Sequence, residues 1–203
     1  MAPIVSDEYK MKKKKQILDS ALICFAEKGY QLATIDDIVQ HSGISKGAIY
    51  NYFKSKEEIY IELMNENTKE LDKDIQEVLQ TYNTAPERVT RLFDLYLRNK
   101  PSESPGKEKF LVYYEFRLFS MRDEGLSDLL QERKKHIFIG NLVEILKEGQ
   151  ENGELSQDFN RELVANTFWS MIHGATLSTI IDKDFPYHEV LKNMKAMFIS
   201  YLS

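Results

Sequence analysis

The chain has 203 residues, of which 42% are apolar and 29% charged, and its net charge at pH 7 is −5. This composition excludes a disordered chain and is enough for one or two domains with an apolar core. Apolar stretches are only a few residues long, and the start of the chain lacks the apolar run of a signal peptide, so neither a membrane span nor a leader is expected. The single cysteine, Cys24, excludes an internal disulfide and a cysteine-based zinc site, and a cytoplasmic protein is expected.

Charge is unevenly distributed along the chain. Residues 1–56 contain nine Lys, no Arg and six acidic residues, a net charge of +3, whereas the remainder contains 18 basic and 26 acidic residues, a net charge of −8. A basic N-terminal segment on an acidic body suggests an anionic partner at one end of the molecule. The run Lys12 to Lys15 fits either an arm that adds phosphate contacts or a solvated helix start without a partner.

Short helices are predicted in the first third of the chain. Apolar residues from Ile17 to Phe25 recur at helical spacing, and Gly29 is typical of a helix end. Thr34 can accept a hydrogen bond from the N–H of Asp37, which is the capping geometry of a helix start. This second helix is short because Ser-Gly follows at 42–43.

A third helix is predicted from the cap Ser45 to about Tyr52, and longer helices follow in the acidic remainder. Ser55 and Glu58 form a capping box at the start of a helix that reaches Tyr82. The clearest polar loop is 99–108, and no segment alternates as a strand would. Further helices are predicted at about 89–97, 110–121, 126–150, 160–181 and 186–201. The fold class is therefore all-α, with about nine helices.

Residues 34–53 have the pattern of a helix-turn-helix, in which two short helices flank a Ser-Gly-Ile-Ser turn. Gly43 suits this turn because it can adopt a positive φ. Four apolar side chains are expected to pack the helices together, namely Ile38, Ile44, Ile49 and Phe53. Short or polar residues then face outward, as on a recognition helix that approaches base edges: Ser45, Lys46, Gly47, Ala48, Asn51 and Tyr52.

Three further residues are candidates for phosphate contacts at the edges of this motif. Tyr50 can reach a phosphate through its hydroxyl group, and Thr34 offers a hydroxyl and free N–H groups at a helix start. Lys56 lies in the first turn of the next helix and can do likewise. The candidate DNA-binding set is thus Thr34, Ser45, Lys46, Gly47, Ala48, Tyr50, Asn51, Tyr52 and Lys56.

Residues from about 12 to 64 resemble the DNA-binding domain of the TetR (tetracycline-repressor-like) family. Val39 replaces the usual Ala, which affects local packing only, and Tyr52 replaces the commoner His with another aromatic group. The resemblance rests on Phe25-Ala-Glu-Lys-Gly-Tyr30, Thr34-Ile-Asp-Asp-Ile38, Ser42-Gly-Ile-Ser-Lys-Gly-Ala-Ile-Tyr-Asn-Tyr-Phe53 and Lys56-Glu57.

This resemblance implies a homodimer that binds a palindromic operator in double-stranded DNA. Family members act mostly as repressors, and a small molecule bound by their C-terminal helical domain releases the DNA. We therefore expect a helix-turn-helix domain at 1–56, with a linking helix from Ser55, and a helical ligand-binding and dimerisation domain at 57–203. The helix from Ser55 to Tyr82 joins the two and is the expected lever. No cofactor is expected.

Aromatic side chains are concentrated between Phe110 and Phe119 and recur on later helices. They form either ordinary core or the lining of an apolar pocket, which would suit an aromatic or lipophilic ligand. The candidates for this lining are Phe110, Tyr114, Phe138, Trp169 and His173. Residues 163–181 also lack a continuous polar face, so this helix and 187–202 are expected to pair with their copies in a second subunit.

An enzyme is not expected from the motifs present. Gly43-Ile-Ser-Lys-Gly47 matches the Gly-x-Ser-x-Gly of a hydrolase, but that motif needs a strand before the serine, where a helix is predicted. Phosphate-binding and zinc-protease motifs are absent, and His173 and His188 are isolated, so no metal site is expected. The main alternative is a helical ligand carrier that has lost DNA binding, and an activator remains open within the regulatory interpretation.

Overall fold

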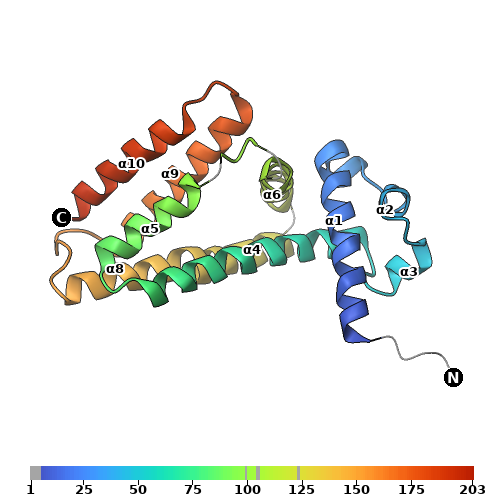
Figure 1. Cartoon of the computed structure of the whole chain (residues 1–203), viewed down its shortest axis with the longest axis horizontal. Coiled ribbons are helices and arrows are strands. Elements are labelled where there is room, and N and C mark those ends of the chain that lie inside the picture. The colour runs from blue at the N-terminus through green and yellow to red at the C-terminus, as the bar shows by residue number, and fades with distance from the viewer. Residues whose placement is uncertain (1–5, 99, 104–105, 123) are drawn as a thin grey trace. The chain divides into compact units, whose positions relative to one another are not determined.

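A computed structural model describes residues 6–98, 100–103, 106–122 and 124–203, which form ten α-helices and one π-helical segment with no strand among them (Figure 1). This confirms the all-α class. The helices are α1 (Asp7–Leu32), α2 (Ile35–Ser42), α3 (Lys46–Tyr50), α4 (Lys56–Thr81), α5 (Ala85–Leu97), α6 (Gly106–Ser120), α7 (Glu124–Arg133), the π-helix η1 (Lys134–Gly140), α8 (Asn141–Glu151), α9 (Arg161–Ile181) and α10 (Tyr187–Leu202). No described helix is both long and apolar enough to cross a membrane.

The chain divides into two compact units. The first unit comprises the residues up to Thr68 together with Glu108–Leu118, the middle of α6. The second unit comprises Lys69–Lys107 and Phe119–Ser203. Helices α4 and α6 therefore each contribute to both units. The functional boundary predicted after residue 56 stays a prediction.

The first unit has a small core of apolar side chains from α1 to α4. The four residues predicted to pack the helix-turn-helix are all buried, namely Ile38, Ile44, Ile49 and Phe53. An aromatic cluster extends this core, with Tyr60 of α4 at its centre. The ring centroid of Tyr60 lies 5.0 Å from that of Phe25, 4.4 Å from Tyr30 and 4.8 Å from Phe116.

The first helix does not end where the sequence predicted. Gly29 leaves the helical conformation, with φ 76° and ψ 154°, but α1 continues to Leu32 beyond this break. The N–H of Ala33 then donates to the carbonyl oxygen of Gly29 at 3.1 Å. The glycine was correctly singled out, but it introduces a kink and not a terminus.

The helix predicted over 126–150 is also different in the structure. It is divided into α7, η1 and α8, which explains why ten α-helices replace the expected nine among the described residues. Side chains hydrogen-bond to two backbone carbonyl groups of this π-helical segment. Trp169 Nε1 donates to the carbonyl oxygen of Phe138 at 2.7 Å, and Asn141 Nδ2 donates to that of Ile137 at 2.9 Å.

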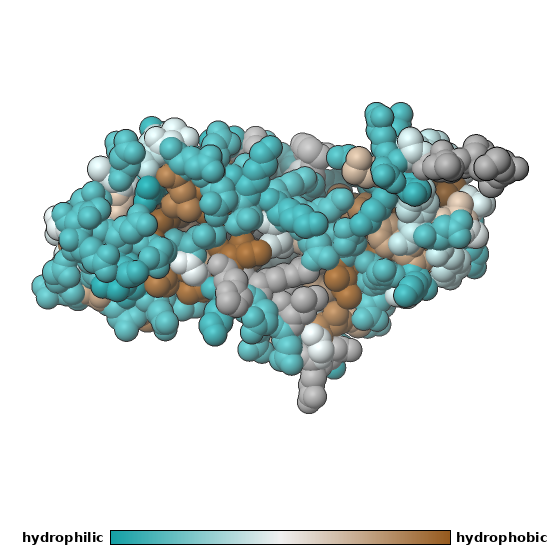
Figure 2. All heavy atoms as spheres, turned by 90° about the horizontal axis from the view of Figure 1, so that it is seen from below, coloured by the Kyte–Doolittle hydropathy of each residue, from teal (hydrophilic) through white to brown (hydrophobic). Residues whose placement is uncertain are grey.

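The second unit is built on a large apolar core shared by α5, α8, α9 and α10. Three phenylalanines meet edge to face at its centre. The centroid of Phe93 lies 4.7 Å from that of Phe168 and 5.5 Å from that of Phe198. On the face of the molecule seen in Figure 2, hydrophilic side chains cover most of the described surface and hydrophobic ones form small separate patches.

Candidate nucleic-acid interface

The helix-turn-helix is formed by local hydrogen bonds that the sequence anticipates. Thr34 Oγ1 accepts the N–H of Asp37 at 3.2 Å, and Asp37 Oδ2 accepts the N–H of Thr34 at 2.8 Å, which completes a capping box for α2. Gly43 ends α2 in the left-handed conformation, with φ 68°. Ser45 Oγ then accepts the N–H of Ala48 at 3.3 Å and caps α3. The predicted helix, turn and second helix are therefore confirmed.

The outward face of α3 is open to solvent. Ala48 and Tyr52 are half-buried against the fold. Among the other predicted residues, Lys56 is half-buried and the following are exposed: Thr34, Ser45, Lys46, Gly47, Tyr50 and Asn51. The structure thus presents these exposed residues to solvent, and their contacts with DNA stay predictions.

Lys46 is held by an ion pair across the motif. Its Nζ lies 2.9 Å from Asp36 Oδ1, and the pKa of Lys46 is raised chiefly by its hydrogen bond to Asp36. Both side chains are largely exposed, so solvent screens the pair. The predicted contact of Lys46 with DNA would therefore require it to exchange Asp36 for a base or a phosphate, a competition that sequence reasoning did not foresee.

The start of α2 is organised by Asp37. Lys28 Nζ lies 2.5 Å from Asp37 Oδ1, and the hydrogen bonds from Lys28 and then Thr34 lower the pKa of Asp37 from its ordinary 3.8 to about 2. The Thr34 hydroxyl group donates to this carboxylate at 2.8 Å. The hydroxyl and N–H of Thr34 are thus used within the cap, so a phosphate at this end would rely on the amide groups that follow.

Lys56 has a structural use that the sequence did not reveal. Its ammonium group donates to the carbonyl oxygens of Tyr30 at 2.6 Å, Gln31 at 3.2 Å and Ala33 at 2.8 Å. It also lies 4.5 Å from the ring centroid of Tyr30, and burial lowers the pKa of Lys56. Lys56 therefore caps the carbonyl groups at the C-terminal end of α1. Its predicted phosphate contact stays a prediction.

The lysine run, for which both a phosphate-contacting arm and a solvated helix start were expected alternatives, belongs to α1. The helix begins at Asp7, with Ser6 Oγ accepting the N–H of Tyr9 at 3.3 Å, so Lys12 to Lys15 are helical. Lys14 Nζ lies 2.6 Å from Glu62 Oε1, whereas Lys12 and Lys15 are exposed. A solvated helix face and a set of phosphate contacts both remain compatible with this placement.

The five residues predicted for a ligand pocket are divided between the two units. Phe110 and Tyr114 lie on the part of α6 that belongs to the first unit, and both are half-buried. In the second unit, the ring centroid of the buried Trp169 lies 5.0 Å from that of Phe138 and 6.2 Å from that of His173. Trp169 fills this region with its own ring, so it is core as well as a ligand candidate.

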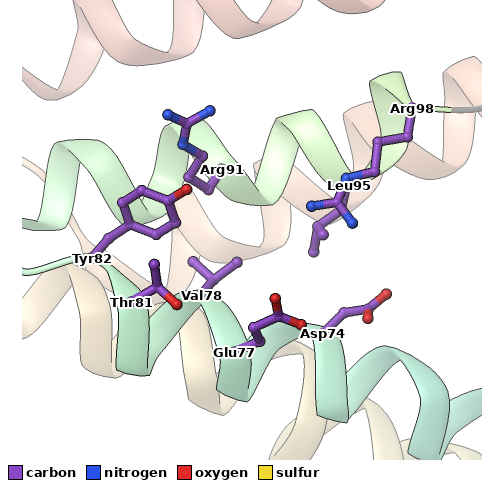
Figure 3. Close-up of a pocket in the computed structure, with 8 residues that line it drawn as sticks. All are labelled: Asp74, Glu77, Val78, Thr81, Tyr82, Arg91, Leu95 and Arg98. Carbon is purple, nitrogen blue, oxygen red and sulfur yellow. The ribbon is translucent and has the colours of Figure 1, made fainter.

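A small groove in the second unit lies between α4 and α5 and contains none of these five residues (Figure 3). Its α4 wall carries the carboxylates of Asp74 and Glu77, and its α5 wall carries Arg91 and Arg98. The Arg91 guanidinium carbon lies 4.9 Å from the ring centroid of Tyr82. The groove holds about 60 Å³, which is far too small for a drug-sized ligand.

Two family models match this sequence. Residues 17–63 match the model described as bacterial regulatory proteins, tetR family, and residues 85–199 match that of the BetI-type transcriptional repressor, C-terminal. The second match alone spans more than half of the chain. The chain belongs to the TetR family.

Individual TetR-family relatives resemble it along most of their length. The fatty acid metabolism regulator protein of Bacillus subtilis is 27% identical over 181 residues, which cover 88% of each chain. A putative transcriptional regulator from Saccharomonospora viridis in complex with choline superposes with a TM-score of 0.79, at 23% identity, over 94% of this chain and 97% of the other. The transcriptional regulator FadR from Bacillus subtilis in complex with stearoyl-CoA superposes with a TM-score of 0.72, at 22% identity, over 93% of this chain and 99% of the other.

Membership of the TetR family decides between the classes that the sequence left open. The protein is a DNA-binding transcriptional regulator of this family, whose members are regulators and not enzymes. The Gly-x-Ser-x-Gly sequence at 43–47 covers the turn and the start of α3, with α2 before it, which is not the context of a hydrolase.

Proposed function

We propose that this TetR-family protein is a cytoplasmic repressor that binds a palindromic operator as a homodimer and leaves it when a lipophilic small molecule binds. The observation that carries the proposal is the open face of α3, which is capped by Ser45 and seated on a buried Ile49. Two such helices, about 34–36 Å apart, would read two half-sites one helical turn apart.

The surfaces of α9 and α10 support a homodimer. Large apolar side chains are exposed on both helices, which pack against each other in the second unit: Leu163, Leu177 and Ile181 on α9, and Met197 and Tyr201 on α10. No Asp, Glu, Lys or Arg occurs between Glu162 and Asp182. Exposed Gly174 would also allow a second helix to approach closely. An uncharged apolar surface of this kind favours burial against its own copy.

A fatty acyl thioester is the proposed class of effector. The relative from Bacillus subtilis is named as a regulator of fatty acid metabolism, and the FadR structure contains stearoyl-CoA. An acyl chain also agrees with an effector domain rich in aromatic and aliphatic side chains. Choline is the second candidate, because Tyr96 and Phe138 flank Trp169 and aromatic rings attract a quaternary ammonium group.

The test begins with selection of bound fragments from a genomic DNA library by the purified protein at about physiological salt. An enriched inverted repeat supports the operator and the dimer, and sedimentation should show a dimer at micromolar concentration. Stearoyl-CoA and choline are then added separately to the complex with the selected fragment. Release by stearoyl-CoA supports the acyl class, whereas release by choline alone contradicts it.

The same selection tests whether binding is sequence-specific. Salt-sensitive binding without any enriched sequence would mean that the basic end attracts DNA of any sequence, and it would contradict the proposed operator. A monomer at micromolar concentration would contradict the α9–α10 interface.

A further inference from the structure

Helix α6 belongs partly to each of the two units. Its middle, Glu108–Leu118, belongs to the first unit, whereas the residues before and after it belong to the second. The chain therefore passes from one unit to the other three times, once within α4 and twice within α6. The expected lever, α4, is thus only one of two helical connections.

Glu115 attaches α6 to the break in α1. Its two carboxylate oxygens accept the N–H of Tyr30 at 2.9 and 3.0 Å. This N–H follows Gly29, where α1 leaves the helical conformation. A Cβ atom at Gly29 would lie 3.0 Å from Glu115 Oε1, so a glycine serves both the positive φ and the close approach of the carboxylate.

A second contact supports the same attachment. The hydroxyl group of Tyr60, which is fully buried, donates to the carbonyl oxygen of Val112 at 2.8 Å. Burial raises the pKa of Tyr60, so this hydroxyl remains a donor. Phe116, one turn after Val112, packs its ring against Tyr60. Val112, Glu115 and Phe116 therefore lie on the face of α6 that contacts α1 and α4. Phe110 and Tyr114 lie on the opposite side of the helix.

The break in α1 is directly connected to the start of α2. Lys28 precedes Gly29 in the chain and forms the ion pair with Asp37, which is part of the α2 capping box. A displacement of Glu115 would therefore move Tyr30, Gly29 and Lys28 together. A contiguous set of contacts thus runs from α6 to the N-terminus of α2, and its energetic coupling is open to measurement.

We propose that Glu115 is a positioning residue that couples α6 to the helix-turn-helix, so that operator binding and the state of α6 depend on each other. The proposal rests on the proposed function, because it requires an operator. It adds a residue and a contact to that function. Linkage requires the coupling to act in both directions, so operator DNA alone can report it.

Deuterium exchange on the full chain tests this coupling, with and without the selected operator fragment. The variants are Glu115→Ala, Glu115→Gln, which keeps one acceptor oxygen, and the control Glu27→Gln, an exposed carboxylate on α1. In the free protein, Glu115→Ala should speed exchange in the peptide containing Tyr30 by about tenfold, as expected for the loss of a hydrogen bond to a charged acceptor.

Operator binding should slow exchange in residues 108–118 of the wild type and of Glu27→Gln. This response should disappear in Glu115→Ala and be intermediate in Glu115→Gln, while α2 and α3 remain protected by DNA in every variant. An unchanged α6 response in Glu115→Ala, or no response in the wild type bound to operator, would overturn the inference alone. Failure of the wild type to select any operator would contradict the proposed function instead.

Discussion

The two units are stabilised in different ways. In the first unit, a small apolar core is joined by individual polar contacts at helix ends, such as Asp37 at the start of α2, Lys56 at the end of α1 and Glu115 at its break. The second unit depends on a broad apolar core in which Phe93, Phe168 and Phe198 are each almost fully buried. Single polar contacts can be exchanged for contacts with DNA, whereas a buried core cannot. The polar contacts of the first unit are therefore the ones that DNA binding can change.

The largest expected effect comes from removing part of the second core. Phe168→Ala should lower the free energy of unfolding by about 3–5 kcal/mol, because it deletes a fully buried ring and leaves a cavity. Urea unfolding followed by circular dichroism measures this. Phe168→Leu should lower the free energy of unfolding by clearly less. Equal decreases in the two variants would contradict a packing explanation.

Lys56→Met sharpens the comparison, because it breaks a single contact of the first unit. Three carbonyl oxygens at the end of α1 lose their donor, and the free energy of unfolding should fall by about 1–3 kcal/mol. The salt dependence of operator binding then separates structure from phosphate contact. An unchanged log–log slope indicates a structural role, whereas a slope shallower by about 0.9 indicates a lost phosphate contact.

Asn51→Ala tests the open face of α3, where stability should hardly change because the side chain is exposed. If Asn51 contacts a base, the variant should bind the selected operator less tightly, by about 1–3 kcal/mol of binding free energy. Its preference among DNA sequences should also change. Lys12→Ala is the control, since a phosphate contact would weaken binding to all sequences alike. Uniform weakening by Asn51→Ala, measured on a panel of operator variants, would contradict base reading.

Acid should act on the first unit through Asp37. Because the folded pKa of Asp37 is lowered to about 2, its contribution to stability is fully present above its ordinary pKa of 3.8 and is lost as the pH falls towards 2. Asp37→Asn should therefore lack that part of the acid dependence. Urea midpoints from pH 6 to pH 2 measure it, and parallel curves for the two proteins would contradict the assignment.

The smallest effect on folding is expected from Asp36→Asn. Its ion pair with Lys46 is largely exposed, so the urea midpoint should stay close to that of the wild type. Removing this carboxylate frees Lys46 and should tighten binding to DNA of any sequence. Titration of operator and of random DNA measures this, and weaker binding to both would show that Asp36 instead positions Lys46.

The sequence predicted what local residues determine. Thr34, Gly43 and Ser45 specify caps and a turn within a few residues, and the structure contains all three as expected. Contacts between distant residues leave no such local pattern. Glu115 and Tyr30 are separated by 85 positions, and nothing near either residue indicates that they meet. The position of Lys56 after the motif made it a candidate for phosphate contact. Its hydrogen bonds to carbonyl groups at the end of α1 could not be predicted, because these groups are 23 to 26 residues away in the sequence.

The division of 126–150 escaped prediction for a related reason. A π-helix differs from an α-helix in the pairing of backbone hydrogen bonds, from i to i+5, and its residue types have no distinct local pattern in this sequence. Two of its carbonyl groups accept hydrogen bonds from Trp169 and Asn141, of which Trp169 lies on another helix. Sequence periodicity records which side of a helix is buried, and it does not record how the backbone hydrogen bonds are paired.

The placement of Trp169 has a practical consequence. It is the only tryptophan in the chain, and its buried indole is hydrogen-bonded to the π-helical segment of the second unit. Intrinsic tryptophan fluorescence therefore reports on the second unit alone, without a label. A titration monitored by tryptophan fluorescence would follow changes in the surroundings of η1 and α9. The helix-turn-helix would contribute no tryptophan signal to it.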